Sequence, residues 1–388
     1  MRLGEIQEHL KREGLEGWLF FDHHRRDPLA YRVLRFDPPR IPTRRWYYLV
    51  PAAGEPRGLV HRIERGMLDA LPGGKRVYAS WAEQVEGLKE VLAGCGRVAM
   101  QYSPRCAIPY VAMVDAGTVE LVRSLGVEVA SAADLVQFFE ARWTREMLES
   151  HLEAGRRVDE IRGEAFRLIG ARVRGGARVS ELEVKEFIRG RFAEAGLVTD
   201  HGPIVAVNEN ASNPHYEPEA EAHREIGRGD LVLIDLWAKL ERPESVYYDI
   251  TWTGVCGEPA AAVERVFAVV RGARDRAVRF VEEAVAAGRE LRGFEVDDVA
   301  RGHIRAEGYG EYFTHRTGHS IGVEVHGAGA NLDNLETHDE RRIIPWTCFS
   351  VEPGIYLPEF GMRSEVNVFV GDREARVTGE IQQELVAI

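Results

Sequence analysis

The chain has 388 residues, of which 45% are hydrophobic, and a formal net charge of −12 at pH 7. That length suffices for two domains and a large core, and the composition is typical of a globular protein. The acidic balance argues against nucleic acid as the main partner, because phosphate binding needs a basic surface. No apolar run approaches the roughly 20 residues that span a bilayer, and the N-terminus lacks a signal-peptide core. We therefore expect a cytoplasmic protein that does not enter a membrane, with its scattered cysteines reduced.

Residues 1–141 alternate helix-like and strand-like stretches, which predicts a smaller N-terminal α/β domain. A helix over residues 3–13 is expected to end at Gly14. Strands are expected at WLFF, RRWYYLVP and RVAMQYS, and a helix over VAMVDAGTVELVRSL, which ends before Gly126. We interpret the basic run His23–Arg26 as a solvated loop in preference to a substrate-facing patch.

Residues 142–388 predict a second, larger domain of the α+β class. Thr144 is expected to cap a long helix that runs to about Arg174, and Ser180 with Glu183 forms a capping-box pattern for the next helix. Strands are then expected at IVAVN, LVLIDLWA and VYYDITWT. Two helices follow, and CFSVEPGIY, RSEVNVFV and QELVAI are expected to close a mostly antiparallel sheet.

Four acidic residues and one histidine stand out in this second domain: Asp235, Asp249, His319, Glu352 and Glu365. Most of them lie in or beside apolar, strand-like runs, where a lone ionised carboxylate would be costly. Taken singly, each acid is more often a surface or salt-bridged residue than a ligand. Four carboxylates and an imidazole brought together suit two divalent cations, which can activate water at neutral pH.

The numbering suggests how the acids could meet. A regular hairpin centred on Arg242 would place Asp235 directly opposite Asp249. Glu352 and Glu365 are symmetric about Pro358-Glu359, so simple pairing also places them opposite each other. A single bulge would shift either register.

A histidine-rich segment, HRTGHSIGVEVH, lies between the two acidic pairs and contains His315, His319 and His326. Gly318 and Gly322 argue against a helical His-x-x-x-His metal site, because glycine weakens a helix interior. We therefore expect a loop followed by a strand.

The segments VLIDLWAK, YYDITWTG, HRTGHSIGVEVH, SVEPGIYLPEFG and MRSEV resemble, in this order, those of the pita-bread metallopeptidases. That family includes prolidase, aminopeptidase P and, more distantly, methionine aminopeptidase. The resemblance covers roughly residues 145–388. It implies a C-terminal pita-bread (creatinase/aminopeptidase-like) domain, preceded by a smaller α/β domain like the N-terminal domain of creatinase.

The resemblance also implies a role for each residue of the metal site. Two divalent ions, which could be manganese, cobalt, zinc or iron, would bind with Asp235 on one ion, His319 and Glu352 on the other, and Asp249 and Glu365 bridging both. Glu352 would also move protons during catalysis.

Three further residues match active-site positions of the family. By resemblance, His215 in NPHYEP would lie near the scissile bond, and His326 would be the second active-site histidine. Both would bind substrate and assist catalysis. Arg363 matches a substrate-binding arginine of the proline-specific branches. Trp237 and Trp252 depart from the family pattern, which puts the shape of the substrate pocket in doubt.

The resemblance implies hydrolysis of the peptide bond that precedes proline. The short interval from Glu352 to Glu365 and the compact N-terminal domain favour a dipeptidase that acts on Xaa-Pro. The resemblance alone implies a homodimer. One alternative is an Xaa-Pro aminopeptidase that acts on longer peptides. The others are a binding module without hydrolysis and a metal-free, creatinase-like hydrolase, and the complete ligand set argues against both.

Overall fold

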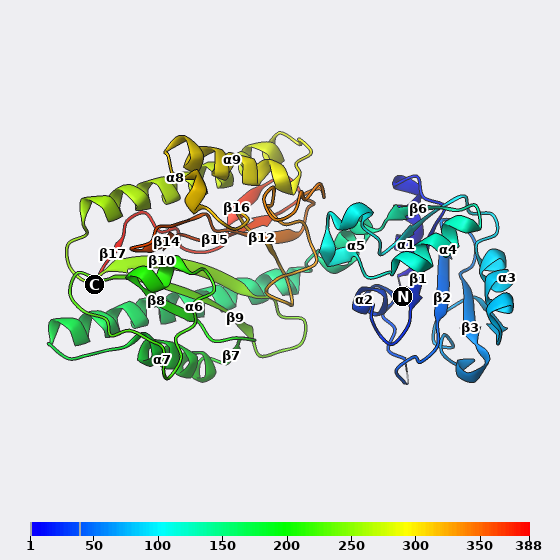
Figure 1. Cartoon of the computed structure of the whole chain (residues 1–388), viewed down its shortest axis with the longest axis horizontal. Helices are drawn as coiled ribbons and strands as arrows, with labels where there is room; N and C mark the ends of the chain where they lie inside the picture. Colours follow the sequence, from blue (N-terminus) through cyan, green and yellow to red (C-terminus); the bar gives the residue numbers. More distant parts are fainter. Residues whose placement is uncertain (1, 39) are drawn as a thin grey trace. The chain divides into compact units, whose positions relative to one another are not determined.

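The computed structural model describes residues 2–38 and 40–388 and divides the chain into two compact units (Figure 1). The units are Met1–Glu140 and Ala141–Ile388, so their boundary lies one residue from the expected one.

The N-terminal unit is an α/β domain around a mixed sheet with the strand order β4-β3-β2-β1-β5-β6. Strands β1 and β2 pair antiparallel, whereas β1 with β5, β3 with β4 and β5 with β6 are parallel pairs. The strands are β1 (Gly17–Asp22), β2 (Trp46–Pro51), β3 (Arg57–His61), β4 (Gly74–Tyr78), β5 (Arg97–Met100) and β6 (Glu128–Ser131). The helices are α1 (Leu3–Arg12), α2 (Pro28–Leu34), α3 (Trp81–Val91), α4 (Ala116–Ser124) and α5 (Ala133–Glu140).

The helix expected over VAMVDAGTVELVRSL is shorter than predicted. Asp115 caps α4, because its carboxylate accepts a hydrogen bond from the Thr118 amide, so the helix begins only at Ala116. The preceding apolar residues lie in a 3-10 turn, Pro109–Val111, and in loop. The apolar run therefore predicted burial correctly, but the capping aspartate determines where the helix begins.

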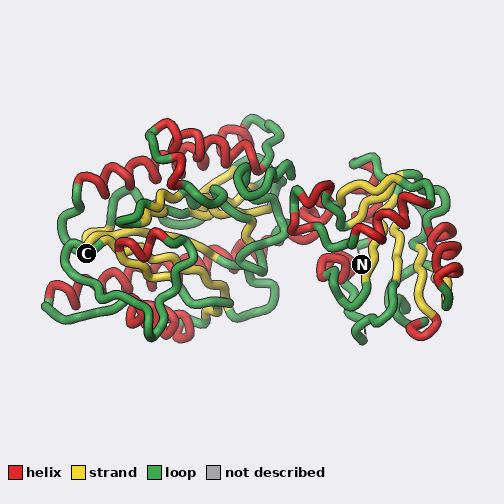
Figure 2. The backbone as a smooth tube through the Cα atoms, viewed as in Figure 1, coloured by secondary structure: helices red, strands yellow, loops and turns green. Residues whose placement is uncertain are grey.

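The C-terminal unit contains sheets lying between two helical layers (Figure 2). One sheet has the order β17-β10-β9-β7, with β8 also paired to β9; another has the order β11-β12-β15-β16; and β13 pairs with β14. The strands are β7 (Leu197–Val198), β8 (Ile204–Val207), β9 (Leu231–Leu240), β10 (Tyr248–Val255), β11 (Ser320–Ile321), β12 (Thr347–Val351), β13 (Gly354–Tyr356), β14 (Gly361–Arg363), β15 (Val366–Val370), β16 (Ala375–Val377) and β17 (Val386–Ala387).

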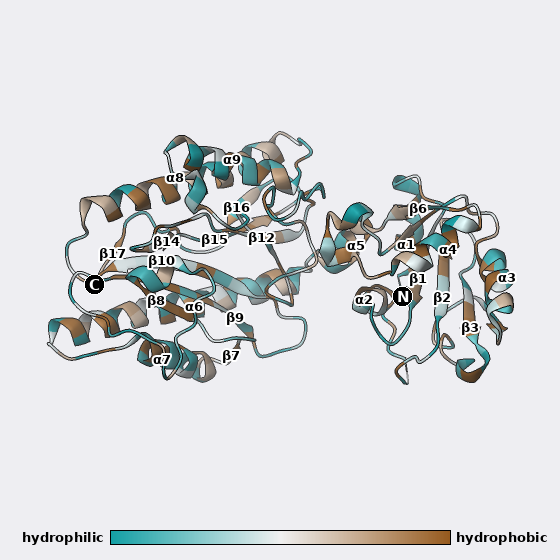
Figure 3. Cartoon of the chain, viewed as in Figure 1, coloured by the Kyte–Doolittle hydropathy of each residue, from teal (hydrophilic) through white to brown (hydrophobic). Residues whose placement is uncertain are grey.

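The helices of this unit are α6 (Arg145–Arg174), α7 (Glu181–Glu194), α8 (Ala261–Ala286) and α9 (Gly293–Ala306). Helices α6 and α7 bury their apolar faces with β8, β9 and β10, and α8 and α9 bury theirs with β12 and β15. Figure 3 shows hydrophobic and hydrophilic residues alternating along α6 and α8, as expected for helices that cover a sheet on one side. The predicted caps at Thr144 and Ser180 are both confirmed.

The two predicted acidic pairings had different outcomes. The pairing of Asp235 with Asp249 was wrong, because Asp235 faces Thr251 and Asp249 faces Trp237. The observed register pairs Tyr248 with Ala238, so the hairpin is centred on Pro243, one residue later than predicted. For the other pairing, the strands on either side keep the predicted register.

Glu352 and Glu365 lie between two antiparallel strand pairs, β12 with β15 and β13 with β14, which share one register. Val351 pairs with Val366 on one side, and Gly354 pairs with Arg363 on the other. Continuing this register across the interruption places Glu352 opposite Glu365. Among the described residues, no helix combines the length and apolar character required to cross a membrane.

Candidate metal centre

The five predicted ligands lie on or next to strands of the C-terminal unit. Asp235 and Asp249 lie within β9 and β10, Glu352 follows β12, and Glu365 and His319 directly precede β15 and β11. Strand β10 contacts β15, so residues more than 100 positions apart in sequence meet here.

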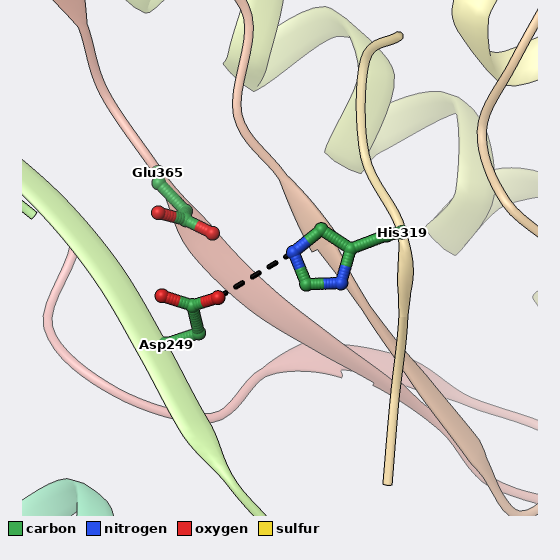
Figure 4. A group of neighbouring side chains, drawn as sticks. All are labelled: Asp249, His319 and Glu365. Atoms are coloured by element: carbon green, nitrogen blue, oxygen red, sulfur yellow. Dashed lines mark ion pairs between the residues drawn. The ribbon is translucent and has the colours of Figure 1, made fainter. Parts of the chain in front are cut away.

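Asp249, His319 and Glu365 form the centre of the cluster and point toward one another (Figure 4). Their potential ligand atoms all lie within 4.8 Å of one another. The His319 Nε2 atom is 3.4 Å from Asp249 Oδ2 and 3.5 Å from Glu352 Oε1. Such convergence of carboxylates on one imidazole matches the donor set of a transition-metal site.

Three buried carboxylate oxygens in this cluster have no hydrogen-bond partner among the described residues. They are Asp235 Oδ1, Asp249 Oδ1 and Glu365 Oε1. Buried polar atoms are normally satisfied, because an unpaired one loses its hydration without compensation. The unpartnered oxygens belong to residues expected to bind metal, so the site fits divalent cations that would ligate them.

Crowding and burial disfavour negative charge at the cluster when no cation balances it. Burial, followed by the nearby Asp235, raises the pKa of Asp249 well above its usual range. Burial and then Asp249 do the same to the pKa of Glu365. Burial also raises the pKa of Glu352 and lowers that of His319. Bound cations would reverse this preference by stabilising the carboxylates as anions.

Hydrogen bonds from three polar residues hold the ligands in place. The Thr251 hydroxyl donates to Glu365 Oε2 at 2.8 Å, and the Asn367 side-chain oxygen accepts from the Asp249 amide at 3.0 Å. Such supporting contacts fix the orientation of metal ligands.

The third supporting residue is Ser350. Its hydroxyl accepts from the His319 amide at 2.9 Å and donates to Glu352 Oε1 at 3.1 Å. Sequence reasoning missed all three supporting residues, although a signal was present. Thr251, Asn367 and Ser350 each lie two positions from a predicted ligand, and strand periodicity places such residues on the same face.

Comparison with known proteins identifies the family. Residues 149–372 match the model for metallopeptidase family M24, which is more than half of the chain. The chain belongs to metallopeptidase family M24.

Several relatives of this M24 chain have names that describe peptidases. It is 33% identical over 222 residues to an Xaa-Pro dipeptidase of Lactobacillus delbrueckii subsp. lactis, covering 56% of this chain and 55% of the relative. It is 30% identical over 267 residues to the uncharacterized peptidase YqhT of Bacillus subtilis, covering 67% of this chain and 70% of the relative. The matches with the Lactobacillus and Pyrococcus dipeptidases thus span about half the length of those proteins.

Solved structures share the fold of the M24 chain over nearly its whole length. The dipeptidase PepE from Mycobacterium ulcerans aligns with a TM-score of 0.70 at 23% identity, covering 100% of this chain and 96% of that one. The prolidase from Thermococcus sibiricus aligns with a TM-score of 0.62 at 24% identity, covering 100% and 98%. These likenesses show a pita-bread fold with a preceding α/β domain.

Arg363 of the M24 chain is buried within the cluster. Its Nε donates to Thr251 Oγ1 at 3.0 Å, one terminal nitrogen donates to the Tyr356 hydroxyl at 3.0 Å, and the other forms an ion pair with Asp235. Only 3% of the residue is exposed. These contacts favour positioning of Asp235 over the expected direct contact with substrate. His315 extends the network, because its Nε2 lies 2.6 Å from the Tyr356 hydroxyl.

The two histidines expected to bind substrate lie outside the innermost cluster. The His326 ring centroid is 4.4 Å from that of His319, and the His326 residue is exposed. The proximity of His319, followed by partial burial, lowers the pKa of His326 to about 3. His215 is exposed, and its backbone amide donates to Asn213 Oδ1 at 3.1 Å.

The two tryptophans that depart from the family pattern lie on opposite sides of their sheet. Trp237 shares a face with Asp235 and faces Asp249, and its Nε1 donates to Asp200 Oδ1 at 2.8 Å. Trp252 projects from the other face of β10, where the Arg162 guanidinium stacks 3.6 Å from its ring centroid. Only Trp237 is therefore placed to shape a substrate pocket beside the metal centre.

Proposed function

We propose that this chain is a dinuclear metal-dependent peptidase that hydrolyses the bond preceding proline, with Xaa-Pro dipeptides as its preferred substrates. The observation that carries the proposal is the cluster of Asp249, His319 and Glu365, whose ligand atoms converge and whose buried carboxylate oxygens include two without a partner among the described residues. Relatives named Xaa-Pro dipeptidase support the choice of substrate class.

The proposed ligand assignment follows the order of the family motifs. Asp235 would bind one ion, His319 and Glu352 the other, and Asp249 and Glu365 would bind both. When bound, two divalent cations lower the pKa of water and stabilise the charge that develops on a peptide carbonyl. The hydrogen bonds from Thr251 and Ser350 would keep Glu365 and Glu352 oriented for binding.

Glu352 is the proposed proton carrier. Its Oε1 accepts a hydrogen bond from the Ser350 hydroxyl at 3.1 Å, whereas Oε2 lies 4.0 Å from Arg363 Nε. Because Ser350 holds only one of its oxygens, the other oxygen of Glu352 could accept a proton. It would take a proton from the attacking water and deliver it to the proline nitrogen, which leaves as a secondary amine.

His326 and His215 are the proposed substrate-binding histidines. His326 is exposed beside His319, so its ring can donate one hydrogen bond to a substrate carbonyl while it remains uncharged. His215 is exposed on the segment after η4 (Asn208–Ser212), and it is close enough to His326 to influence the pKa of that ring.

A turnover panel tests the proposed substrate. Xaa-Pro dipeptides, Xaa-Pro-Xaa tripeptides and peptides with N-terminal methionine would be offered to the protein with manganese, cobalt, zinc or iron. Fastest turnover of the dipeptides is expected. Faster turnover of tripeptides would replace this assignment with an Xaa-Pro aminopeptidase, an activity named for a Caenorhabditis elegans structural neighbour. Metal binding without any cleavage would place the substrate outside the proline-specific branches.

Assembly, location and metal identity are further parts of the proposal. We infer a homodimer from the family resemblance, and light scattering that gives the mass of one chain at micromolar concentration would refute it. We infer a cytoplasmic location because, among the described residues, the cysteines are free thiols. Carboxylates with one imidazole suit manganese, cobalt, zinc and iron, and metal analysis of the protein as purified would choose among them.

A further inference from the structure

The N-terminal unit contains a cavity of about 630 Å³ that takes no part in the metal centre. Its lining comes from the end of β1, the loop before β2, and the starts of α3 and α4. The volume falls within the range of sites for small organic molecules, roughly 300–1,000 Å³. We call it the arginine cavity, after Arg26, Arg44 and Arg45, which line it.

The residues that line the arginine cavity include more positive than negative side chains. Among the described residues, none of its three arginines has a carboxylate within ion-pair distance. The acidic residue in the lining, Asp115, accepts from the Thr118 amide and hydroxyl as the cap of α4. Among the lining residues, three arginines against one aspartate give a formal charge of +2, and the carboxylates of Asp22 and Glu64 lie behind the lining on the backbone of Arg26 and Arg44. Unpaired guanidinium groups at a concave surface are suited to bind an oxyanion.

Two carboxylates fasten the loops that present these arginines. Asp22 accepts from the backbone amides of Arg25 at 2.8 Å and Arg26 at 2.7 Å. Glu64 accepts from the amides of Thr43 at 2.8 Å and Arg44 at 3.2 Å. The loops are therefore held in place by contacts to their backbone amides. Their positions do not depend on contacts of the arginine side chains.

The first of these loops also has a costly backbone conformation. His24 and Arg25 adopt φ values of 66° and 59°, in the left-handed region that non-glycine residues rarely occupy. Strain of this kind persists where surrounding contacts enforce it, and it concentrates at ligand-binding sites. Here the contacts of Asp22 enforce it, and the result places His23 and Arg26 on the cavity wall.

The positive groups repel one another when no anion is bound. Partial burial lowers the pKa of His23, and the nearby His24, Arg26 and Arg45 lower it further. His61 also lines the cavity, but its Nδ1 accepts from the Ile63 amide and its Nε2 lies 3.2 Å from the Ala79 carbonyl. His61 is therefore part of the wall. One terminal nitrogen of Arg44 donates to the Thr43 carbonyl at 3.0 Å and to the Thr43 hydroxyl at 3.2 Å, so Arg26, Arg45 and the other nitrogens of Arg44 supply the donors for a ligand.

The remaining wall is aromatic. Phe21 and Tyr78 are buried behind the cavity, and Trp81 lies at its edge with 78% of its surface exposed. An exposed tryptophan beside arginines can stack on a planar group while the guanidinium groups hold a charge.

We propose that the arginine cavity binds a small organic phosphate, with the phosphate on Arg26, Arg44 and Arg45 and a planar group against Trp81. All lining residues belong to the N-terminal unit, and the proposal does not rest on the proposed peptidase activity.

Calorimetric titration of the full chain tests this proposal with adenosine monophosphate, inorganic phosphate and citrate as probes. Titrations are run with and without divalent metal, because phosphate could also bind to the metal centre. The double variant Arg44→Gln/Arg45→Gln is expected to bind adenosine monophosphate at least about tenfold more weakly, with and without metal. Arg12→Gln, an exposed arginine of α1 outside the cavity, removes one positive charge of the same unit and should have no effect.

Two further variants separate the parts of the site. Trp81→Ala should weaken the binding of adenosine monophosphate and leave the affinity for inorganic phosphate unchanged. If circular dichroism shows that the double variant does not fold, Arg26→Gln removes one of the three positive charges from the other loop instead. The proposal is overturned by unchanged affinity in the arginine variants, by binding that disappears when metal is removed, or by citrate binding tighter than either phosphate. Absence of binding at ligand concentrations up to about 10 mM would also overturn the proposal. Such a result means a binding free energy weaker than ~3 kcal/mol.

Discussion

The guanidinium of Arg363 forms an ion pair with the carboxylate of Asp235, and both side chains are buried. The same guanidinium donates to Thr251 and Tyr356, so one planar group joins β14 to β9 and β10. The other oxygen of Asp235 has no partner among the described residues, so the ion pair leaves it available as a metal ligand.

Arg363→Lys should therefore impair metal binding and turnover while preserving the fold. Lysine can keep one contact with Asp235, but a single ammonium group cannot reproduce the three directed contacts of a guanidinium. We expect metal affinity or kcat/KM to fall by about 10–100-fold, the usual effect of removing a group that orients a ligand. Arg373→Lys, an exposed site after β15, is the matched control. A variant that binds metal and turns over like the parent protein would contradict a positioning role.

Asp249→Asn should remove most activity and at least one metal ion. The substitution keeps the shape of the side chain and removes the charge that a bridging ligand supplies. Burial raises the pKa of Asp249, so loss of that charge should not destabilise the metal-free protein. Metal analysis and thermal unfolding with and without chelator would measure both effects. Retention of two ions and the full rate would defeat the bridging assignment.

His319→Ala and His326→Ala should separate metal binding from substrate binding. His319 lies within ligand distance of Asp249 and Glu365, so its loss should release metal. His326 contacts the His319 ring and is exposed, so its loss should leave the metal content unchanged and lower the rate by about 10²-fold. Metal content and kcat/KM are measured together for both variants. Equal metal loss would show that the two histidines have been assigned incorrectly.

Gly318→Ala should destabilise the metal centre far more than Gly322→Ala. A methyl group on Gly318 would lie 1.9 Å from the Ser350 carbonyl oxygen. The hydroxyl of the same serine accepts from the His319 amide. The nearest atoms to a methyl group on Gly322 are 3.9 Å away, which is ordinary contact. We expect a cost of about 1–3 kcal/mol for the first change and little for the second. Denaturant unfolding measures this difference, and equal costs would argue against the close approach.

The sequence proposed five ligand residues, and the structure brings the potential ligand atoms of Asp249, His319 and Glu365 within 4.8 Å of one another. The sequence did not reveal how these residues are held. Each predicted ligand lies in or beside a strand. A buried carboxylate within an apolar run needs a compensating partner, and such a carboxylate can be recognised from the neighbouring residues alone. The contacts from Thr251, Asn367 and Ser350 join residues about 31 to 118 positions apart. Such pairings depend on which sheets meet, and hydrophobic periodicity does not specify this.

The hairpin register was the part of the site that sequence predicted least well. Lys239 and Leu240 pair with β7, and Glu244 turns with φ 58°, so the connection to β10 is not a symmetric turn about Arg242. A two-residue error kept Asp235 and Asp249 on one face, because side chains alternate with a period of two. The shared face of Asp235 and Asp249 therefore does not depend on the exact register.

Asp27→Asn should stabilise the protein at neutral and alkaline pH. Asp27 caps α2 through Oδ1, which accepts from the Ala30 amide at 3.0 Å, while Oδ2 is buried without a partner among the described residues. Burial raises the pKa of Asp27 to about 7, and the neighbouring Asp22 adds to this effect. Between about pH 4 and pH 7 the unfolded chain loses this proton while the folded chain keeps it, so the free energy of unfolding falls as the pH rises.

Asparagine keeps the capping oxygen and has no proton to lose, so the variant should show a flatter dependence of stability on pH. The gain above pH 7 should be a few kcal/mol at most, since one pKa unit corresponds to ~1.4 kcal/mol. Thermal unfolding midpoints of the parent protein, Asp27→Asn and Asp27→Ala at pH 5 and pH 8 would measure it. Alanine removes the cap and should be less stable than asparagine at both values. An asparagine variant with the same midpoint difference between pH 5 and pH 8 as the parent protein would show that Asp27 does not hold its proton in the folded chain.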